Sequence, residues 1–257
     1  MKLNYGGAIP ISTVDWHGKV SITLFLGGCP LRCPYCQNYR ILSESRIVDV
    51  AEVEKEIKKA KPFVSSIVFS GGEPLMQASA LKHLARFAKE NGLLVGIHTN
   101  GFYPAHVEEL IKMGLVDKYF VDVKAPPDDP VLYAKVVGSG EYDAVIAGPE
   151  EIVERVTKTV DIIAKNKIEM EIRTTVVPGL IGTPDEISRI AIWVSKHLEG
   201  TDVAYVIQQG LPENAMRESL REVAPFDRYE ILKLARHAHE FWDNVWIRTR
   251  DHGNERV

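Results

Sequence analysis

The sequence lacks the features that mark membrane, exported and nucleic-acid-binding proteins. It has no run of about twenty apolar residues that could span a bilayer. Its first residues, Met1–Gly7, contain no apolar run of signal-peptide length. The formal net charge of −4 provides no basic excess with which to neutralise phosphates. We therefore expect a cytoplasmic protein without a membrane partner, and broad nucleic-acid binding is disfavoured.

Cysteine is scarce, and its placement is the most informative feature of the chain. The three cysteines, Cys29, Cys33 and Cys36, all lie in one loop of eight residues. An odd number at such tight spacing disfavours a disulfide, and the cytoplasm keeps thiols reduced. Closely spaced thiolates instead hold zinc or iron–sulfur clusters.

Two kinds of metal centre fit three thiolates in one loop. A structural zinc site needs four protein ligands in a closed tetrahedron, and the nearest candidate for the fourth is His17. A 4Fe–4S cluster held by three cysteines leaves one iron open to a ligand that is not protein. We favour the cluster, with Cys29, Cys33 and Cys36 as its metal ligands, and keep zinc as the alternative.

Strand-like runs alternate with amphipathic helices along the chain, which is typical of a parallel sheet. The predicted strands are Val20–Phe25, Ile67–Phe69, Leu93–Ile97, Tyr119–Val123, Glu169–Val177 and Val203–Ile207. Six strand–helix units result, whereas a closed barrel of this type normally has about eight. We therefore predict an α/β fold, a partial (βα)6 TIM-like barrel that is open on one side.

The chain is long enough for one large domain with a buried core. Residues 1–210 are expected to form the barrel, and residues 211–257 a C-terminal helical extension of the same domain. This extension contains a predicted helix near Phe226–Phe241 and a short terminal strand at Val245–Ile247.

Residues suited to chemistry follow or end the predicted strands. The cysteine loop follows the first strand, Gly71–Glu73 ends the second, and Thr99–Asn100 ends the third. Asp122 and Lys124 end the fourth strand, and Arg173 lies within the fifth. Because active sites of such barrels lie at the carboxyl ends of the strands, we expect these five segments to converge on one mouth.

Structural explanations exist for the same residues when each is taken alone. The Gly71–Pro74 segment also suits an ordinary turn between a strand and a helix. Asp122 and Lys124 also suit a structural ion pair, Arg173 a salt bridge at the edge of the core, and His98 a buried core histidine.

Several segments together resemble the radical S-adenosylmethionine enzymes. The C-x3-C-x2-C loop, with Tyr35 before its last cysteine, is similar to the cluster loop of that superfamily, and Ser70–Pro74 is similar to its Gly-Gly-Glu segment. His98–Phe102, Val121–Lys124 and Ile172–Gly179 resemble segments of the activases of glycyl radical enzymes, in the same order. The resemblance runs from about residue 10 to residue 210.

Two further segments resemble one branch of these activases. Thr13–Lys19 and Tyr205–Gln209 look most like the activating proteins of the anaerobic ribonucleoside-triphosphate reductase. His98 is a departure, because better-known activases carry an acidic residue at that position.

The resemblance implies a reaction and two cofactors. A 4Fe–4S cluster would pass one electron to bound S-adenosylmethionine, which would break into methionine and a 5′-deoxyadenosyl radical. That radical would take a hydrogen atom from a glycine of a partner, a glycyl radical enzyme such as the anaerobic ribonucleotide reductase. The electron would come from a low-potential donor such as ferredoxin or flavodoxin.

The resemblance also assigns roles to residues. Besides the cysteines, Lys124 and Arg173 would act in catalysis by placing positive charge beside the carboxylate of the cofactor. The expected contacts to S-adenosylmethionine are Tyr35, Ser70, Gly71, Gly72, Glu73, His98, Thr99, Asn100, Asp122, Lys124, Arg173 and Gln208.

Two other functions remain open at the level of the sequence. The same cofactors could serve a radical enzyme that modifies a small metabolite, a peptide or a tRNA base. A zinc-stabilised or electron-transfer binding module without catalysis is an alternative of a different class.

Overall fold

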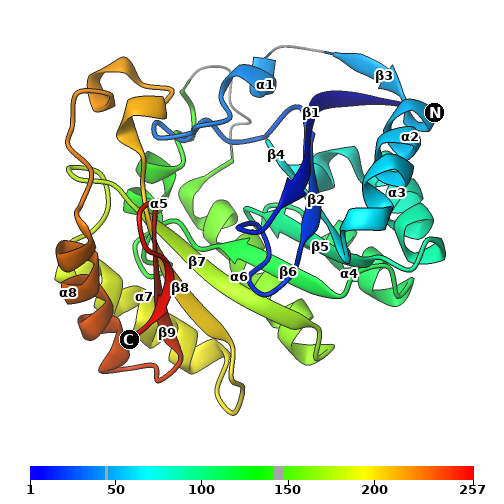
Figure 1. The fold of residues 1–257 in the computed structure, drawn as a ribbon. Coiled ribbons are helices and arrows are strands. Elements are labelled where there is room, and N and C mark those ends of the chain that lie inside the picture. Colours follow the sequence, from blue (N-terminus) through cyan, green and yellow to red (C-terminus); the bar gives the residue numbers. More distant parts are fainter. Residues whose placement is uncertain (44–45, 142–146) are drawn as a thin grey trace.

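The strands of the protein form one strongly curved sheet (Figure 1). The computed structural model describes residues 1–43, 46–141 and 147–257, and in them the sheet has ten strands in the order β10-β9-β8-β7-β6-β5-β4-β2-β1-β3. The strands are β1 Lys2–Ser12, β2 Ser21–Leu26, β3 Ile47–Asp49, β4 Ser66–Gly71, β5 Leu94–Thr99, β6 Lys118–Asp122, β7 Glu169–Val176, β8 Ala204–Gln209, β9 Val245–Thr249 and β10 Gly253–Arg256. Neighbouring strands from β2 through β4 to β9 are parallel, whereas β1, β3 and β10 pair antiparallel at the two margins.

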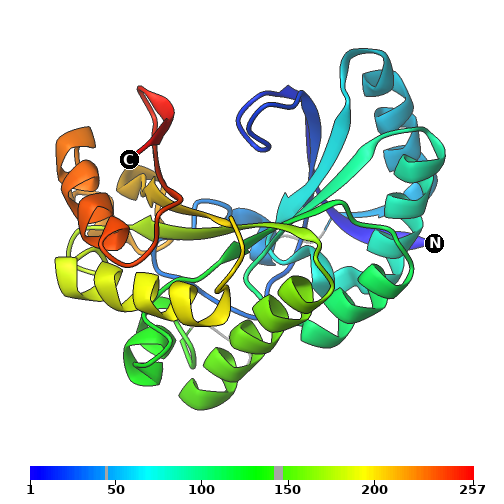
Figure 2. The same cartoon turned by 90° about the horizontal axis from the view of Figure 1, so that it is seen from below.

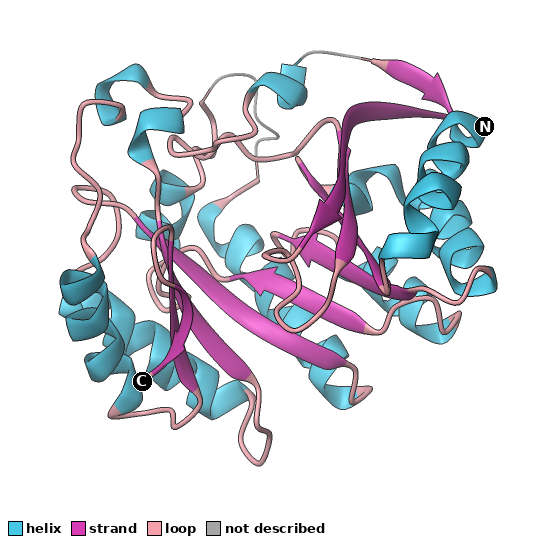
Figure 3. Cartoon of the chain, viewed as in Figure 1, coloured by secondary structure: helices cyan, strands magenta, loops and turns pink. Residues whose placement is uncertain are grey.

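Helices cover the convex face of this sheet (Figures 2 and 3). The longer helices are α2 Val50–Ala60, α3 Ala78–Glu90, α4 Pro104–Lys112, α6 Pro149–Lys165, α7 Pro184–His197 and α8 Arg228–His239. The shorter helices are α1 Arg40–Ser43 and α5 Pro130–Val136, with 3-10 turns at Lys61–Phe63, Pro74–Gln77, Pro212–Asn214 and Glu218–Leu220. Among the described helices, none is long and apolar enough to cross a bilayer.

The local sequence explains why these helices form where they do. Val53 and Ile57 of α2 are fully buried one turn apart, which places the apolar face of the helix on the sheet. The helix α7 begins at a capping box in which the Thr183 side chain accepts from the backbone N–H of Glu186 and the Glu186 side chain accepts from that of Thr183.

The predicted fold class is confirmed. Each of the six predicted strands overlaps one observed strand, from β2 and β4 through β8, and a helix follows each of them. The predicted terminal strand is present as β9 and extends to Thr249, and the last helix is α8. The sheet does not close, because β10 and β3 are its margins. The boundary at residue 210 stays a prediction, and the strands beyond it continue the same sheet.

The sequence did not predict β1, β3 or β10. The strand β1 escaped prediction because it lies at a margin and carries two irregularities in its pairing with β2, one of them between Tyr5 and Gly7. Several of its apolar side chains are exposed, including Ile9 and Ile11. Such a strand has neither a continuous apolar run nor a regular alternation of polar and apolar residues.

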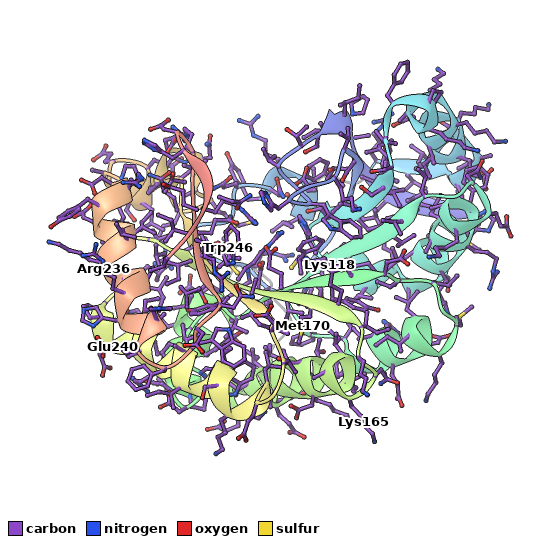
Figure 4. All side chains as sticks on the ribbon, turned by 60° about the horizontal axis from the view of Figure 1, so that its bottom comes forward. Lys118, Lys165, Met170, Arg236, Glu240 and Trp246 are labelled. Atoms are coloured by element: carbon purple, nitrogen blue, oxygen red, sulfur yellow. The ribbon has the colours of Figure 1, made fainter. Side chains whose placement is uncertain are left out.

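A loop links the two margins of the sheet on its concave side. This bridging loop, residues 13–20, joins β1 to β2. The ring of His17 lies 5.9 Å from that of Trp246 on β9, and Asn254 Nδ2 lies 3.1 Å from His17 Nδ1. Figure 4 labels Trp246 beside the space that the sheet encloses. This loop therefore bridges the open side of the sheet through its contacts with β9 and β10.

Candidate active site

The predicted site residues lie around one cavity of about 220 Å³. The lining includes every predicted position except Glu73, namely Cys29, Cys33, Tyr35, Cys36, Ser70, Gly71, Gly72, His98, Thr99, Asn100, Asp122, Lys124, Arg173 and Gln208. They come together because β2, β4, β5, β6, β7 and β8 are parallel neighbours whose carboxyl ends meet at the same end of the sheet (Figure 1).

Sequence reasoning missed five residues that also line the cavity: Leu31, Gln37, Asn38, Leu42 and Thr175. Asn38 has a structural role there, because its Nδ2 donates to the carbonyl oxygen of Gly71 at 3.1 Å. The available signal was its position two residues after the last cysteine, which would have placed it beside any group the cysteines hold.

The cysteine loop presents three free thiols to this cavity. Cys33 is buried, and Cys29 and Cys36 are partly exposed. Removal from solvent raises the pKa of the Cys33 thiol to about 12, and it also raises the pKa of the other two thiols. Without metal these thiols are therefore protonated at neutral pH. The positive charge of iron is what would stabilise them as thiolates.

The donor set fits a cluster better than a closed zinc site. His17, the expected fourth zinc ligand, lies against Trp246 and Asn254 and does not line the cavity. In the described part of the chain, no three His, Cys, Asp or Glu side chains are placed to hold one metal ion. The zinc site with His17 is therefore not assembled, whereas three thiols around one cavity match a cluster with an open iron.

Two glycines let the strand end of β4 approach the cysteine loop. A Cβ atom on Gly72 would overlap the carbonyl oxygen of Gly28, and Gly71 has a φ of 118°, which L side chains rarely adopt. The N–H of Glu73 donates to the carbonyl oxygen of Gly28 at 2.8 Å. Close backbone contact therefore joins the segment before Cys29 to the Gly-Gly-Glu segment.

Glu73 is the predicted contact that does not reach the cavity. Its side chain is fully buried and accepts from Leu75 N at 3.1 Å, Thr99 Oγ1 at 3.0 Å and Asn100 N at 2.8 Å. Burial raises the pKa of Glu73 to about 7, although these three donors oppose the shift. Glu73 thus ties the end of β4 to the end of β5 behind the lining.

A lysine and a tyrosine form one wall of the cavity. Lys124 Nζ donates to Asp122 Oδ2 at 2.8 Å and lies 5.7 Å from the ring centre of Tyr35. Burial alone would lower the pKa of Lys124, but the negative charge of Asp122 and its neighbours raises it well above its usual value. The Tyr35 hydroxyl is buried and has no hydrogen-bond partner among the residues that the structure describes, which leaves a polar atom available to a ligand.

His98 and Arg173 also line the cavity and contact each other. Arg173 Nη1 lies 3.1 Å from His98 Nε2, and Ser70 Oγ lies 3.3 Å from His98 Nδ1. Burial and the charge of Arg173 lower the pKa of His98 to about 4, so the ring is neutral at pH 7. His98 Nε2 also lies 3.1 Å from the carbonyl oxygen of Asp15, so this nitrogen faces one donor, Arg173, and one acceptor, Asp15. His98 is thus both a buried, hydrogen-bonded histidine and a lining residue.

The charge of Arg173 is already compensated by its surroundings. Its Nε donates to Glu171 Oε1 at 2.6 Å, and Glu171 also accepts from Arg248 Nη2 on β9 at 3.0 Å. The two arginines lower the pKa of Glu171 to about 2, although burial opposes the shift. Lys124 and Arg173 therefore each reach the cavity with a carboxylate partner, Asp122 for the lysine and Glu171 for the arginine.

Comparisons with known proteins agree with this geometry. Residues 23–194 match the family model described as the Radical SAM superfamily. A putative glycyl-radical enzyme activating enzyme of Methanocaldococcus jannaschii is 37% identical over 250 residues, which cover 97% of both chains. The pyruvate formate-lyase-activating enzyme of Clostridium pasteurianum is 27% identical over 186 residues, 69% of this chain and 70% of that one. A radical SAM methyltransferase from Sphaerobacter thermophilus shares the fold, with a TM-score of 0.67, 14% identity and coverage of 91% of this chain and 67% of that chain.

Proposed function

Because this chain belongs to the radical SAM superfamily, we propose that it cleaves S-adenosylmethionine reductively and installs a glycyl radical on a partner enzyme. The observation that carries the proposal is the single cavity that the three thiols share with the strand-end residues. When bound, the 4Fe–4S cluster and S-adenosylmethionine supply the electron and the 5′-deoxyadenosyl radical that removes a hydrogen atom.

The protein would hold these groups through the residues around the cavity. Cys29, Cys33 and Cys36 ligate three irons of the cluster. The carbonyl oxygens near Gly71 and Gly72 receive the ammonium group of the cofactor, since no side chain blocks their approach.

The walls of the cavity would orient the rest of the cofactor. Lys124 places a charged donor for the carboxylate, and Asp122 fixes the position of the Lys124 ammonium. The unpartnered hydroxyl of Tyr35 and the amide of Gln208 are donors for the nucleoside end. Arg173 contacts His98 and keeps its ring in place, and burial together with the charge of Arg173 lowers the pKa of His98.

The partner is the finer part of this proposal. The printed names of two relatives describe activating enzymes, one of glycyl radical enzymes and one of pyruvate formate-lyase. For this chain we propose the anaerobic ribonucleotide reductase, on the resemblance of Thr13–Lys19 and Tyr205–Gln209. We propose a cytoplasmic ferredoxin or flavodoxin as the electron donor.

The test begins with anaerobic reconstitution with iron and sulfide. Reduced protein incubated with S-adenosylmethionine should yield 5′-deoxyadenosine, and Cys33→Ala should yield none. His17→Ala is the matched control, because it removes the alternative zinc ligand and should keep both the cluster and the cleavage. Zinc without iron or sulfide after reconstitution would instead support a zinc-stabilised binding module.

The second step tests the partner. Wild-type protein, reductant, S-adenosylmethionine and an anaerobic ribonucleotide reductase should give the paramagnetic resonance signal of a glycyl radical. Cleavage without that signal for any glycyl radical enzyme would favour a radical enzyme acting on a small metabolite, a peptide or a tRNA base.

A further inference from the structure

The side-chain amide of Asn100 points at the sulfur of a cysteine that is remote in sequence. Asn100 Nδ2 lies 3.5 Å from Cys29 Sγ, across 71 positions of sequence. This distance is within hydrogen-bonding range for a sulfur acceptor, which is larger than oxygen. Cys29 Sγ also accepts from the backbone N–H of Leu31 at 3.4 Å. One donor thus belongs to the cysteine loop, and the other comes from the end of β5.

The orientation of the Asn100 amide is fixed by a second contact. Its Oδ1 accepts from the backbone N–H of Phe102 at 3.0 Å, and a flipped amide would place two donors against each other. The NH₂ group is therefore the one that faces the sulfur.

The backbone of Asn100 is also held in place. Its N–H donates to the buried carboxyl group of Glu73 at 2.8 Å, and the residue is only 7% exposed. The donor is therefore positioned before any metal binds, and no reorganisation is needed when Cys29 becomes a thiolate.

We propose that Asn100 tunes the reduction potential of the cluster by donating a hydrogen bond to the Cys29 thiolate. Adding an electron to an iron–sulfur cluster increases the negative charge on its sulfurs. A fixed N–H donor therefore stabilises the reduced cluster more than the oxidised one and raises the potential. The inference rests on the proposed function only in that the three cysteines hold a cluster.

The chain offers two informative variants at this position. Asn100→Ala removes the donor to Cys29. Asn100→Asp keeps an acceptor for Phe102 N, and so supports the local turn, but it places a negative oxygen near the sulfur. The matched control is Asn38→Ala, because it removes only a side-chain amide that donates to the carbonyl oxygen of Gly71 and keeps the backbone N–H of Asn38 that faces Cys36.

The measurement is a redox titration of the reconstituted holoprotein, followed by paramagnetic resonance of the reduced cluster, without S-adenosylmethionine. Because the cofactor is absent, a contact between Asn100 and S-adenosylmethionine cannot change the measured potential. Asn100→Ala should lower the equilibrium constant for one-electron reduction about fivefold, a shift of roughly 40 mV at 59 mV per tenfold. Asn100→Asp should lower it further, and Asn38→Ala should leave it unchanged.

Equal potentials in the wild type and both Asn100 variants, at equal iron and sulfide content, would overturn the inference. A shift of the reduction potential in Asn38→Ala as large as that in Asn100→Ala would also overturn the inference. These outcomes are separable from the proposed function, since cleavage of S-adenosylmethionine by the wild type does not depend on them. A shifted potential together with no glycyl radical on any partner would refute the activase role and leave the role of Asn100 in place.

Discussion

Glu73→Gln should change how the stability of the protein depends on pH. Glu73 is fully buried, and its pKa of about 7 lies above the usual 4.5 because burial disfavours the charged carboxylate. The difference of about 2.5 pH units corresponds to about 3 kcal/mol at roughly 1.4 kcal/mol per unit. Glutamine has nearly the same shape but does not titrate, so it removes this contribution.

The sign follows from proton binding. Between pH 4.5 and about 7 the folded protein holds the Glu73 proton more tightly than the unfolded chain does. This contribution is therefore fully present below pH 4.5, is lost as the pH rises through about 7, and changes little above that. The free energy of unfolding of Glu73→Gln, relative to the wild type, should rise by about 3 kcal/mol between pH 4.5 and pH 8.

Urea unfolding of cluster-free protein, followed by circular dichroism under anaerobic conditions at several pH values, measures this difference. The amide of glutamine also faces N–H donors from Leu75 and Asn100, which adds a penalty that does not vary with pH. The informative quantity is hence the change with pH of the difference in unfolding free energy between the two proteins, and not the absolute stability of either. Parallel curves for the two proteins across this range would refute the reasoning.

Three further substitutions test other parts of the site. Gly72→Ala should displace the segment before the cysteine loop and lower the free energy of unfolding by about 2 kcal/mol or more. A lower melting temperature and a lower iron content after reconstitution would show this, and full iron loading at unchanged stability would contradict it. Lys124→Met should weaken binding of S-adenosylmethionine about a hundredfold by calorimetry, because it removes the charged donor beside Asp122; unchanged affinity would rule out a carboxylate contact. Glu171→Gln should lower the free energy of unfolding by about 3 kcal/mol, because the buried Arg173 and the partly buried Arg248 lose their anion. Since the pKa of Glu171 is lowered to about 2, that contribution is present above pH 4.5 and is lost as the pH falls toward 2, so the gap between wild type and variant should close in acid.

Much of the fold was predictable because burial has a clear period in the central elements. Helices such as α2 carry their apolar residues on one face, and the parallel strands between them are short apolar runs. The convergence of the site followed from one rule, that parallel strands end at the same side of a sheet. Strands at the margins obey neither pattern, and β1 was missed for that reason.

The finer roles in the site depend on contacts that no local pattern encodes. Sequence position grouped Glu73 with Gly72, but only the structure shows that Glu73 lies behind the cavity and supports Asn100. For Arg173 the sequence left two roles open, a cofactor contact and a salt bridge at the edge of the core, and the structure shows its ion pair with Glu171, which Arg248, 75 positions away, also contacts. Such long-range pairs follow from the pairing of β7, β8 and β9.

The bridging loop connects the two margins of the open sheet. The described strands do not close into a barrel, so no ladder of hydrogen bonds joins these margins directly. Contacts from His17 to Trp246 and Asn254 clasp the margins on the concave side, and the carbonyl oxygen of Asp15 anchors the same loop to Arg173. These contacts join the two margins at one level of the sheet, so the sheet can widen at that level only if they break.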